Sequence, residues 1–208
     1  KSQILEGKKR GPDRITSELM ERAGINIVTW EEKEYPIGMR EIIDRPYLLY
    51  YKGALPKEGE KSVAIIGARQ CSDYGRRMAE RFGEGLAKEG VTVISGMASG
   101  IDGIAQNAAL EAGGRSIGVL GCGVDVCYPA SNRKLYTDLS KKGGLISEYE
   151  PGRRPIAGQF PRRNRLISAL ADLVLVIEAR EKSGTFITVD FALEQGREVY
   201  ALPGRVED

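Results

Sequence analysis

The chain of 208 residues contains no histidine. Histidine is the commonest general base near neutral pH, so its absence excludes Ser-His-Asp and Cys-His catalysis. The three cysteines, Cys71, Cys122 and Cys127, lack Cys-x-x-Cys spacing, and without histidine they offer too few ligands for a zinc site. We interpret them as small apolar residues in a reducing compartment, and we expect no metal and no other cofactor.

Long apolar runs and a signal peptide are also missing. No run approaches the roughly 20 residues needed to cross a bilayer, and the first residues lack the apolar region of a signal peptide. We therefore expect a cytoplasmic protein that does not contact membranes. The chain begins without methionine, which suggests a fragment. Its formal charge is only +2, so any affinity for nucleic acid must come from local clusters of arginine and lysine.

The hydrophobic pattern divides the chain near residue 45. Residues 1–44 are charge-rich and weakly patterned, and the run over 25–30 has strand or helix-edge character. Residues 47–51 predict a short strand. From residue 62 onward, short apolar runs alternate with segments of helical periodicity, which is typical of a parallel sheet covered on both faces. We predict a main domain over residues 45–208.

The main domain predicts a doubly wound, mostly parallel α/β sheet of extended Rossmann-like type. We place its strands at 63–66, 91–94, 116–120, 144–147, 173–177 and 198–202. We place its helices at 74–89, 102–112, 131–142, 161–171 and 184–196. The first five strands each lead through a loop into a helix, so these loops gather at the carboxyl edge of the sheet, where open α/β folds bind ligands. Function is expected at that edge.

Two glycine-rich loops, residues 67–75 and 95–102, resemble phosphate-binding turns. Glycines before a helix free N–H groups that attract phosphate together with the helix dipole, and Arg69 adds a guanidinium for a bidentate contact. Alternatively, the glycines only form tight turns, and Ser99 and Asp102 only cap a helix. Neither loop has the Gly-x-Gly-x-x-Gly pattern and no P-loop occurs, so dinucleotide binding and NTP hydrolysis lose support.

Two further loops carry weaker signals. Residues 121–129 pair glycines with Tyr128, whose ring can stack or donate a hydrogen bond. Residues 182–188 open a helix with hydroxyl groups and a glycine, where a phosphate or a ribose can sit. An ordinary helix cap explains the second loop as well.

The strongest local charge is the arginine-rich stretch, residues 151–165, which holds five arginines and no acidic residue. Arginine forks match phosphate oxygens, and Phe160 offers a face on which a base can stack for about 1–3 kcal/mol. Alternatively, Phe160 anchors a solvated basic loop whose arginines pair with Glu148, Glu150 or Glu178. Nothing in the sequence fixes a distance between these carboxylates, so salt bridges suit Glu148 and Glu178 better than acid–base catalysis.

Taken together, these loops resemble the DNA-processing protein A family (DprA/Smf). The resemblance runs from about residue 44 to residue 204, and its motifs are Gly67-Ala-Arg69, Ser95-Gly-Met-Ala-Ser-Gly-Ile-Asp102, Gly121-Cys-Gly-Val-Asp125 with Tyr128-Pro129, Ser147-Glu-Tyr149, Phe160-Pro-Arg-Arg-Asn-Arg165 and Ser183-Gly-Thr. It implies a homodimeric, non-enzymatic protein that binds single-stranded DNA in a basic pocket. It also implies that the protein protects incoming strands and loads the RecA recombinase during natural transformation and DNA recombination.

The resemblance also assigns DNA contacts, motif by motif. The best contacts are Arg69 and the segment Phe160, Arg162, Arg163, Asn164 and Arg165. The backbone or hydroxyl contacts to phosphate are Ser95, Gly96, Ser99, Gly100 and Ser183. No catalytic residue is implied.

Three features depart from the family pattern. Gln106 stands where the family usually has histidine, so a role of that imidazole is absent here. The family usually continues beyond residues 202–208, so we expect a carboxyl-terminal truncation. Residues 1–44 match the helical, SAM-like amino-terminal domain of the family poorly, and we expect at most a remnant of it.

Two other functions stay open. A nucleotide-processing Rossmann enzyme, such as a lysine-decarboxylase-like phosphoribohydrolase, also places Gly-Thr loops and a glutamate at the sheet edge. The chain lacks the Pro-Gly-Gly-x-Gly-Thr motif of those enzymes, and release of a free base from a nucleoside monophosphate would identify one. A module that recognises only a protein partner would leave the arginine-rich stretch without a task.

Overall fold

The computed structural model describes residues 18, 20–181 and 183–204. The elements in chain order are β1 (Asn26–Thr29), α3 (Ile37–Arg40), β2 (Leu48–Gly53), β3 (Ser62–Gly67), α4 (Asp73–Lys88), β4 (Thr92–Ser95), α5 (Ile101–Glu111), β5 (Ser116–Val119), the 3-10 turn η1 (Ala130–Asn132), α6 (Arg133–Lys142), β6 (Gly144–Ser147), α7 (Gln159–Leu170), β7 (Leu173–Glu178), α8 (Thr185–Glu194) and β8 (Glu198–Ala201). Within these ranges, no helix has both the length and the apolar character needed to cross a membrane.

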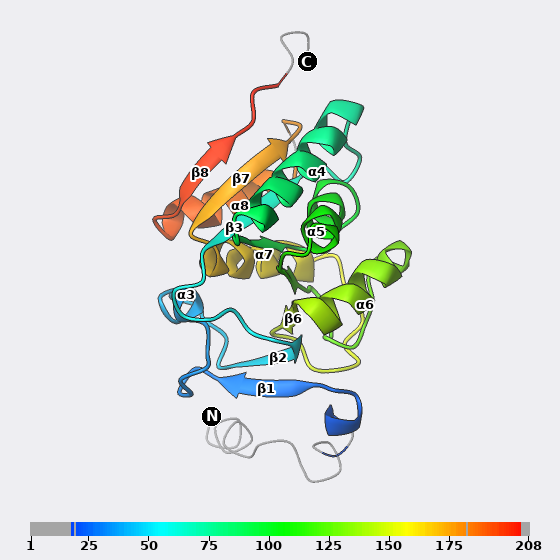
Figure 1. The fold of residues 1–208 in the computed structure, drawn as a ribbon. Coiled ribbons are helices and arrows are strands. Elements are labelled where there is room, and N and C mark those ends of the chain that lie inside the picture. The colour runs from blue at the N-terminus through cyan, green and yellow to red at the C-terminus, as the bar shows by residue number, and fades with distance from the viewer. Residues whose placement is uncertain (1–17, 19, 182, 205–208) are drawn as a thin grey trace.

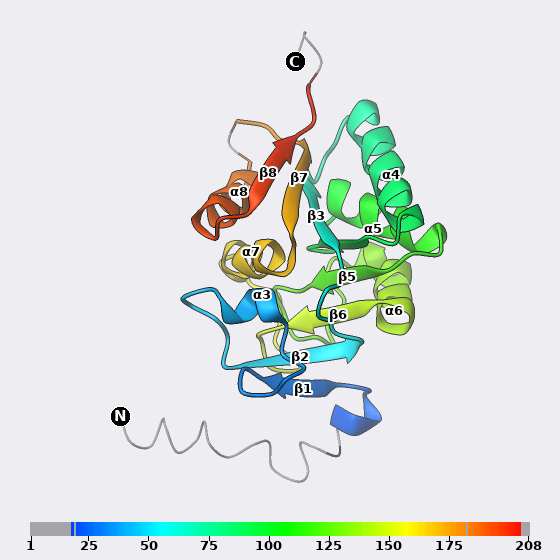
Figure 2. The same ribbon diagram turned by 60° about the vertical axis from the view of Figure 1, so that its left-hand side comes forward.

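The described strands form an eight-stranded sheet in the order β1-β2-β6-β5-β4-β3-β7-β8 (Figure 1). The six strands from β6 to β8 pair in parallel, whereas β1 and β2 run antiparallel to their neighbours. Strands β3 to β6 are almost completely buried, because helices cover both faces. Helices α4, α5 and α6 pack on one face, and α3, α7 and α8 pack on the other (Figure 2). This is the predicted doubly wound, mostly parallel α/β sheet.

Residues 26–44 belong to this same sheet and core, and the boundary expected near residue 45 does not separate them from the rest. Val28 of β1 pairs with Leu49 of β2 in antiparallel register. Tyr35 and Met39 are buried in the same apolar cluster as Val28 and Leu49. A four-residue edge strand is too short to show clear alternation, which explains why its pattern looked weak. The expected helical remnant falls mainly on residues 1–17 and 19, outside the described residues.

The parallel strands bring their following loops to one edge, as the sequence predicts. The loop after β3 contacts the start of α5, since Ile101 N donates to Ala68 O at 3.2 Å. It also contacts the end of β7, since Ala68 N donates to Glu178 O at 2.8 Å. These hydrogen bonds connect three loops from distant parts of the sequence at the carboxyl edge of the sheet.

Candidate functional site

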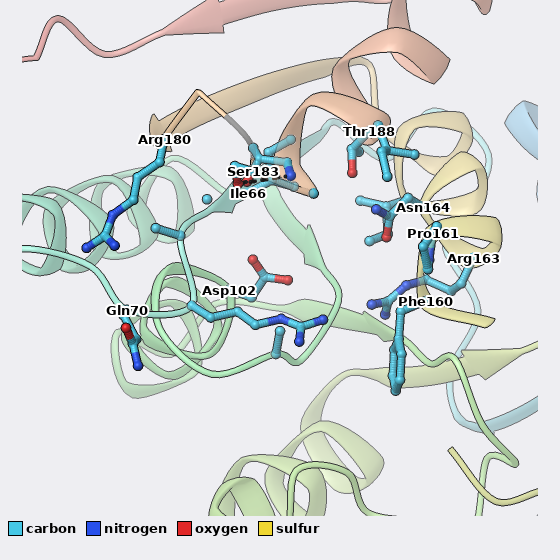
Figure 3. A pocket seen from close by; sticks show the side chains of 18 residues that line it. Ile66, Gln70, Asp102, Phe160, Pro161, Arg163, Asn164, Arg180, Ser183 and Thr188 are labelled. Carbon is cyan, nitrogen blue, oxygen red and sulfur yellow. Dashed lines mark hydrogen bonds between the residues drawn. The ribbon is translucent and has the colours of Figure 1, made fainter. Parts of the chain in front are cut away.

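A cavity of about 600 Å³ opens at this edge, between the loop after β3, the start of α5, the first turns of α7 and the start of α8 (Figure 3). From the predicted contact residues, it is lined by Arg69, Phe160, Arg163, Asn164 and Ser183. It is also lined by residues that were not predicted as contacts, namely Gln70, Asp102, Arg180, Thr185 and Thr188. The loops expected to bind a ligand therefore do converge on one cavity.

One end of the cavity is an aromatic and cationic surface. The guanidinium carbon of Arg69 lies 5.8 Å from the centre of the Phe160 ring, within the range of a cation–π contact. The Phe160 ring also contacts Tyr128: the two ring centres lie 5.3 Å apart, and the ring planes are inclined by 30°. A Cβ on Gly121 would lie 2.8 Å from the Phe160 ring, so glycine is needed for the ring to seat there. Phe160 is half-buried, so its packing restricts its orientation while part of the side chain stays exposed.

A buried pair of opposite charge underlies this end. Arg163 is 4% exposed and Asp102 is 8% exposed. The Nη1 atom of Arg163 donates to Gly96 O at 2.9 Å and to Val119 O, while Gly96 N donates to Asp102 Oδ2 at 3.1 Å. The Arg163 side chain therefore joins α7 to the ends of β4 and β5. Its Nε–H has no hydrogen-bond partner within the described part of the chain.

The two charges stabilise each other in this dry environment. Burial lowers the pKa of Arg163 to about 10, against the opposing effect of Asp102, so the guanidinium stays protonated near neutral pH. Burial raises the pKa of Asp102, while Arg163 and the hydrogen bond from Gly96 N act in the opposite direction. Burial is thus the main cause of both pKa shifts, and the nearby group of opposite charge moderates each of them.

The loop between β4 and α5 has mainly an architectural role in this structure. The Ser95 hydroxyl is fully buried and donates to Ile65 O at 2.6 Å, and Gly96 is buried between Arg163 and Asp102. Gly100 adopts a positive φ of 76° next to the backbone of the β3 loop, where a side chain would clash. Ser99 is exposed. None of these four predicted residues lines the cavity.

The helix-capping interpretation of Asp102 and Ser99 is wrong. The N-cap residue of α5 is Gly100, and no side chain caps the helix. The Asp102 carboxylate instead reaches back to the backbone of Gly96 and connects the first turn of α5 to the end of β4. The sequence indicates correctly that Asp102 lies at the start of a helix, but the hydrogen-bond partner of its carboxylate depends on the packing of the loop.

Arg165 is a scaffold residue and not a surface arginine. Its side chain is 2% exposed, and its Nη1 and Nη2 atoms donate to the two carboxylate oxygens of Glu148 at 2.9 and 2.8 Å. Its Nε also forms an ion pair with Asp44 at 2.6 Å. The alternative in which arginines of this stretch pair with Glu148 therefore holds for Arg165, whereas Arg162 is exposed and does not line the cavity.

The other strand-end carboxylate, Glu178, is also engaged. Its oxygens accept from Ser72 N at 3.0 Å and from the Ser72 hydroxyl at 2.7 Å. Ser72 in turn caps α4, because its hydroxyl accepts from Gly75 N at 3.0 Å. Glu178 thus connects β7 to the start of α4 through Ser72, and within the described residues it does not form the ion pair with an arginine that the sequence led us to expect.

Gln106 has a structural role at the position where the family pattern has histidine. It is fully buried: Met97 N donates to its Oε1 at 3.0 Å, and its Nε2 donates to Ser116 Oγ at 3.1 Å and to Ile117 O at 3.0 Å. All these partners are uncharged. The amide therefore holds the loop after β4 on the start of β5 without a titratable group.

Arg180 is the most informative residue that was not singled out from the sequence. It is exposed, it follows β7 by two residues and it lines the cavity. Its position between the end of a predicted strand and the Ser183-Gly-Thr segment is the feature of the sequence that indicates a place at the binding edge. In the described residues, no group of three acidic or thiol side chains is arranged to hold a metal ion.

Comparison with known proteins gives consistent relatives. The family model described as DNA recombination-mediator protein A matches residues 26–208. DNA processing protein DprA of Streptococcus pneumoniae is 43% identical over 174 residues, which cover 84% of this chain and 61% of that protein. DNA processing protein DprA of Bacillus subtilis is 40% identical over 187 residues, which cover 89% of this chain and 63% of that protein. The chain thus spans somewhat less than two thirds of the length of these relatives.

Two solved structures are similar over nearly the whole chain. The X-ray structure of DNA processing protein A from S. pneumoniae superimposes with a TM-score of 0.84 at 39% identity, covering 92% of this chain and 68% of that one. DNA processing protein A from Helicobacter pylori, whose structure concerns its single-stranded DNA binding mode, gives a TM-score of 0.79 at 32% identity and covers 89% of this chain and 85% of that one.

Proposed function

Because this chain belongs to the DNA recombination-mediator protein A family, we propose that it binds single-stranded DNA without cutting it. The strand occupies the cavity at the carboxyl edge of the sheet. The observation that carries this proposal is the Arg69 guanidinium held 5.8 Å from the Phe160 ring at the cavity mouth. A cation for phosphate beside a partly exposed aromatic ring for a base is the combination that single-strand binders use.

The contacts divide by exposure. Arg69 and Arg162 are exposed and meet phosphates, Phe160 stacks on a base, and Asn164 and Ser183 offer hydrogen bonds from the cavity wall. The buried Arg163, with its pKa lowered only to about 10, keeps its charge and orients the helix that carries Phe160. Ser95, Gly96 and Gly100 act by shaping the loop, and Ser99 meets the strand where it passes over the surface.

The absence of chemistry is part of the proposal. The chain has no histidine, and both strand-end carboxylates hold backbone or arginine groups in place. Asp102 lies in the cavity, but its Oδ2 accepts from Gly96 N and the residue is almost fully buried. Because these carboxylates are already engaged in hydrogen bonds or ion pairs, they favour a binding protein over a phosphoribohydrolase, which needs a free acid or base.

We also propose that the protein forms a homodimer and delivers the bound strand to the RecA recombinase in the cytoplasm, during natural transformation and DNA recombination. Exposed apolar side chains support the dimer: Phe186 and Leu193 on α8 are 44% and 61% exposed, and Tyr200 on the adjoining β8 is 53% exposed. The strand β8 is also at the sheet edge. Exposed apolar side chains on an edge strand and on the helix before it are suited to contact with a second copy of the chain. Sedimentation of wild type and Leu193→Glu checks it, since the dimer should be lost in the variant.

Fluorescence anisotropy with a labelled single strand and its duplex at several salt concentrations tests the binding. The wild type should prefer the single strand and show a steep salt dependence, and Arg69→Ala should reduce the slope by about 0.7. Phe160→Ala should weaken binding by about 1–3 kcal/mol, roughly 5- to 150-fold, with little change in slope. Phe160→Tyr is the matched control because it keeps the aromatic face.

Two outcomes would count against this function. Absence of single-strand binding by the folded wild type at low salt would refute it for this chain. Release of free base from a nucleoside monophosphate would instead identify the enzymatic alternative.

A further inference from the structure

The cavity has a second basic end that the predicted contacts do not include. In Figure 3, Arg180 and Gln70 lie on one side of Asp102, and Phe160 and Arg163 lie on the other. Arg69 belongs to the Phe160 end, because its guanidinium lies over that ring. The cavity is therefore bounded by two exposed arginines, with a buried carboxylate between them.

Charge then decides where phosphates go. Arg163 is buried and its Nη1 donates to the carbonyl oxygens of Gly96 and Val119, so Arg69 and Arg180 are the exposed arginines that line the cavity. In the described residues, no ion pair or hydrogen bond occupies the Arg180 guanidinium. Phosphates are therefore expected at the two exposed arginines and not beside the Asp102 carboxyl group.

The lining of the cavity is suited to a nucleoside. Ile66, Ile167 and Ile187 contribute apolar surface to it, and Asn164 and Thr188 contribute polar groups. Apolar walls with a few polar groups are typical of a site for a small organic ring system. The cavity thus combines such a lining with an exposed arginine at each end.

We propose that Arg180 is a second phosphate contact, and that the cavity holds one nucleotide of the strand between a phosphate at Arg69 and the next phosphate at Arg180. The amino terminus of α8, which begins at Thr185 on the same cavity wall, adds to the positive potential at the Arg180 end. This inference rests on the proposed single-strand binding and specifies its register. The strand enters the cavity and does not only cross its mouth.

Salt titrations of three variants test the second contact. Arg180→Ala should weaken single-strand binding and reduce the salt slope by about 0.7, and Arg69→Ala/Arg180→Ala should reduce it by about 1.4. Arg81→Ala is the matched control: Arg81 is an exposed arginine on α4 that does not line this cavity, and it should leave affinity and slope unchanged. Arg180→Ala with the slope and affinity of Arg81→Ala would overturn the proposal while the wild type still binds DNA.

Competition with thymidine 3′,5′-bisphosphate and thymidine 5′-monophosphate tests the bracketing directly. The bisphosphate carries the two phosphates that flank one nucleoside, so it should displace the labelled strand at a lower concentration than the monophosphate does. This advantage should disappear in Arg180→Ala. A bisphosphate that competes no better than the monophosphate in the wild type would refute the register. Failure of the wild type to bind any single strand would refute the proposed function itself.

Discussion

Replacing Arg165 with methionine separates the scaffold role of the arginine-rich stretch from its DNA contacts. The change keeps much of the side-chain length and removes the charge. It leaves the Glu148 carboxylate, whose side chain is only 10% exposed, without its two hydrogen bonds from Arg165. Removing one partner of a buried ion pair costs about 3–5 kcal/mol of folding free energy. Arg165→Met should therefore lower the free energy of unfolding by this amount.

The ion pair of Arg165 with Asp44 can be compared with its pair with Glu148. Asp44 is 62% exposed, so its ion pair with Arg165 is screened by solvent. Exposed pairs contribute at most about 1 kcal/mol, and Asp44→Asn should cost no more than that. The double variant Arg165→Met/Glu148→Leu should recover part of the loss, because no buried charge is then left unpaired.

Urea denaturation followed by circular dichroism measures these differences, and DNA binding is measured on the folded protein. Arg165→Met should keep its salt slope for single-strand binding, because the side chain does not line the cavity. A cost equal to that of Asp44→Asn would refute the scaffold reasoning. A fully stable Arg165→Met variant with a reduced salt slope would show instead that Arg165 contacts DNA.

Two further predictions concern local packing and pH. Gly96→Ala should destabilise the protein by about 1–3 kcal/mol, because the new Cβ would lie 2.6 Å from Arg163 Nη2 and 2.8 Å from Asp102 Oδ2. Gly85→Ala on α4, where the added Cβ meets open space, should instead stabilise the protein by about 0.5–1 kcal/mol. Equal effects of the two variants in urea denaturation would contradict this reasoning. Burial raises the pKa of Tyr35 from 10.0 to about 12, so the folded state holds the phenol proton more tightly and this stabilisation, present below pH 10, is lost as the pH rises through 12. Unfolding at pH 9 to 11 should show a smaller alkaline loss in Tyr35→Phe than in the wild type.

The fold class follows from local patterns that the sequence displays directly. Buried parallel strands need continuous runs such as Val63–Ile66 and Leu173–Ile177, and their alternation with helical segments allows few topologies. β1 was hard to place because an edge strand of four residues carries too little pattern. The pairing of β1 with β2 follows from long-range burial of Val28, Tyr35 and Met39.

Local spacing already shows that arginines gather near Phe160, and composition shows that no histidine is available for catalysis. Which of these arginines face the cavity depends on the tertiary structure. Arg163 and Arg165 are buried because their partners, the carbonyl oxygens of Gly96 and Val119 and the Glu148 carboxylate, come from distant segments that the sheet brings beside α7. The type of a residue determines its charge, but burial and the available partner determine whether that charge binds a ligand or stabilises the fold. Burial and partner in turn depend on contacts between residues that are far apart in the chain.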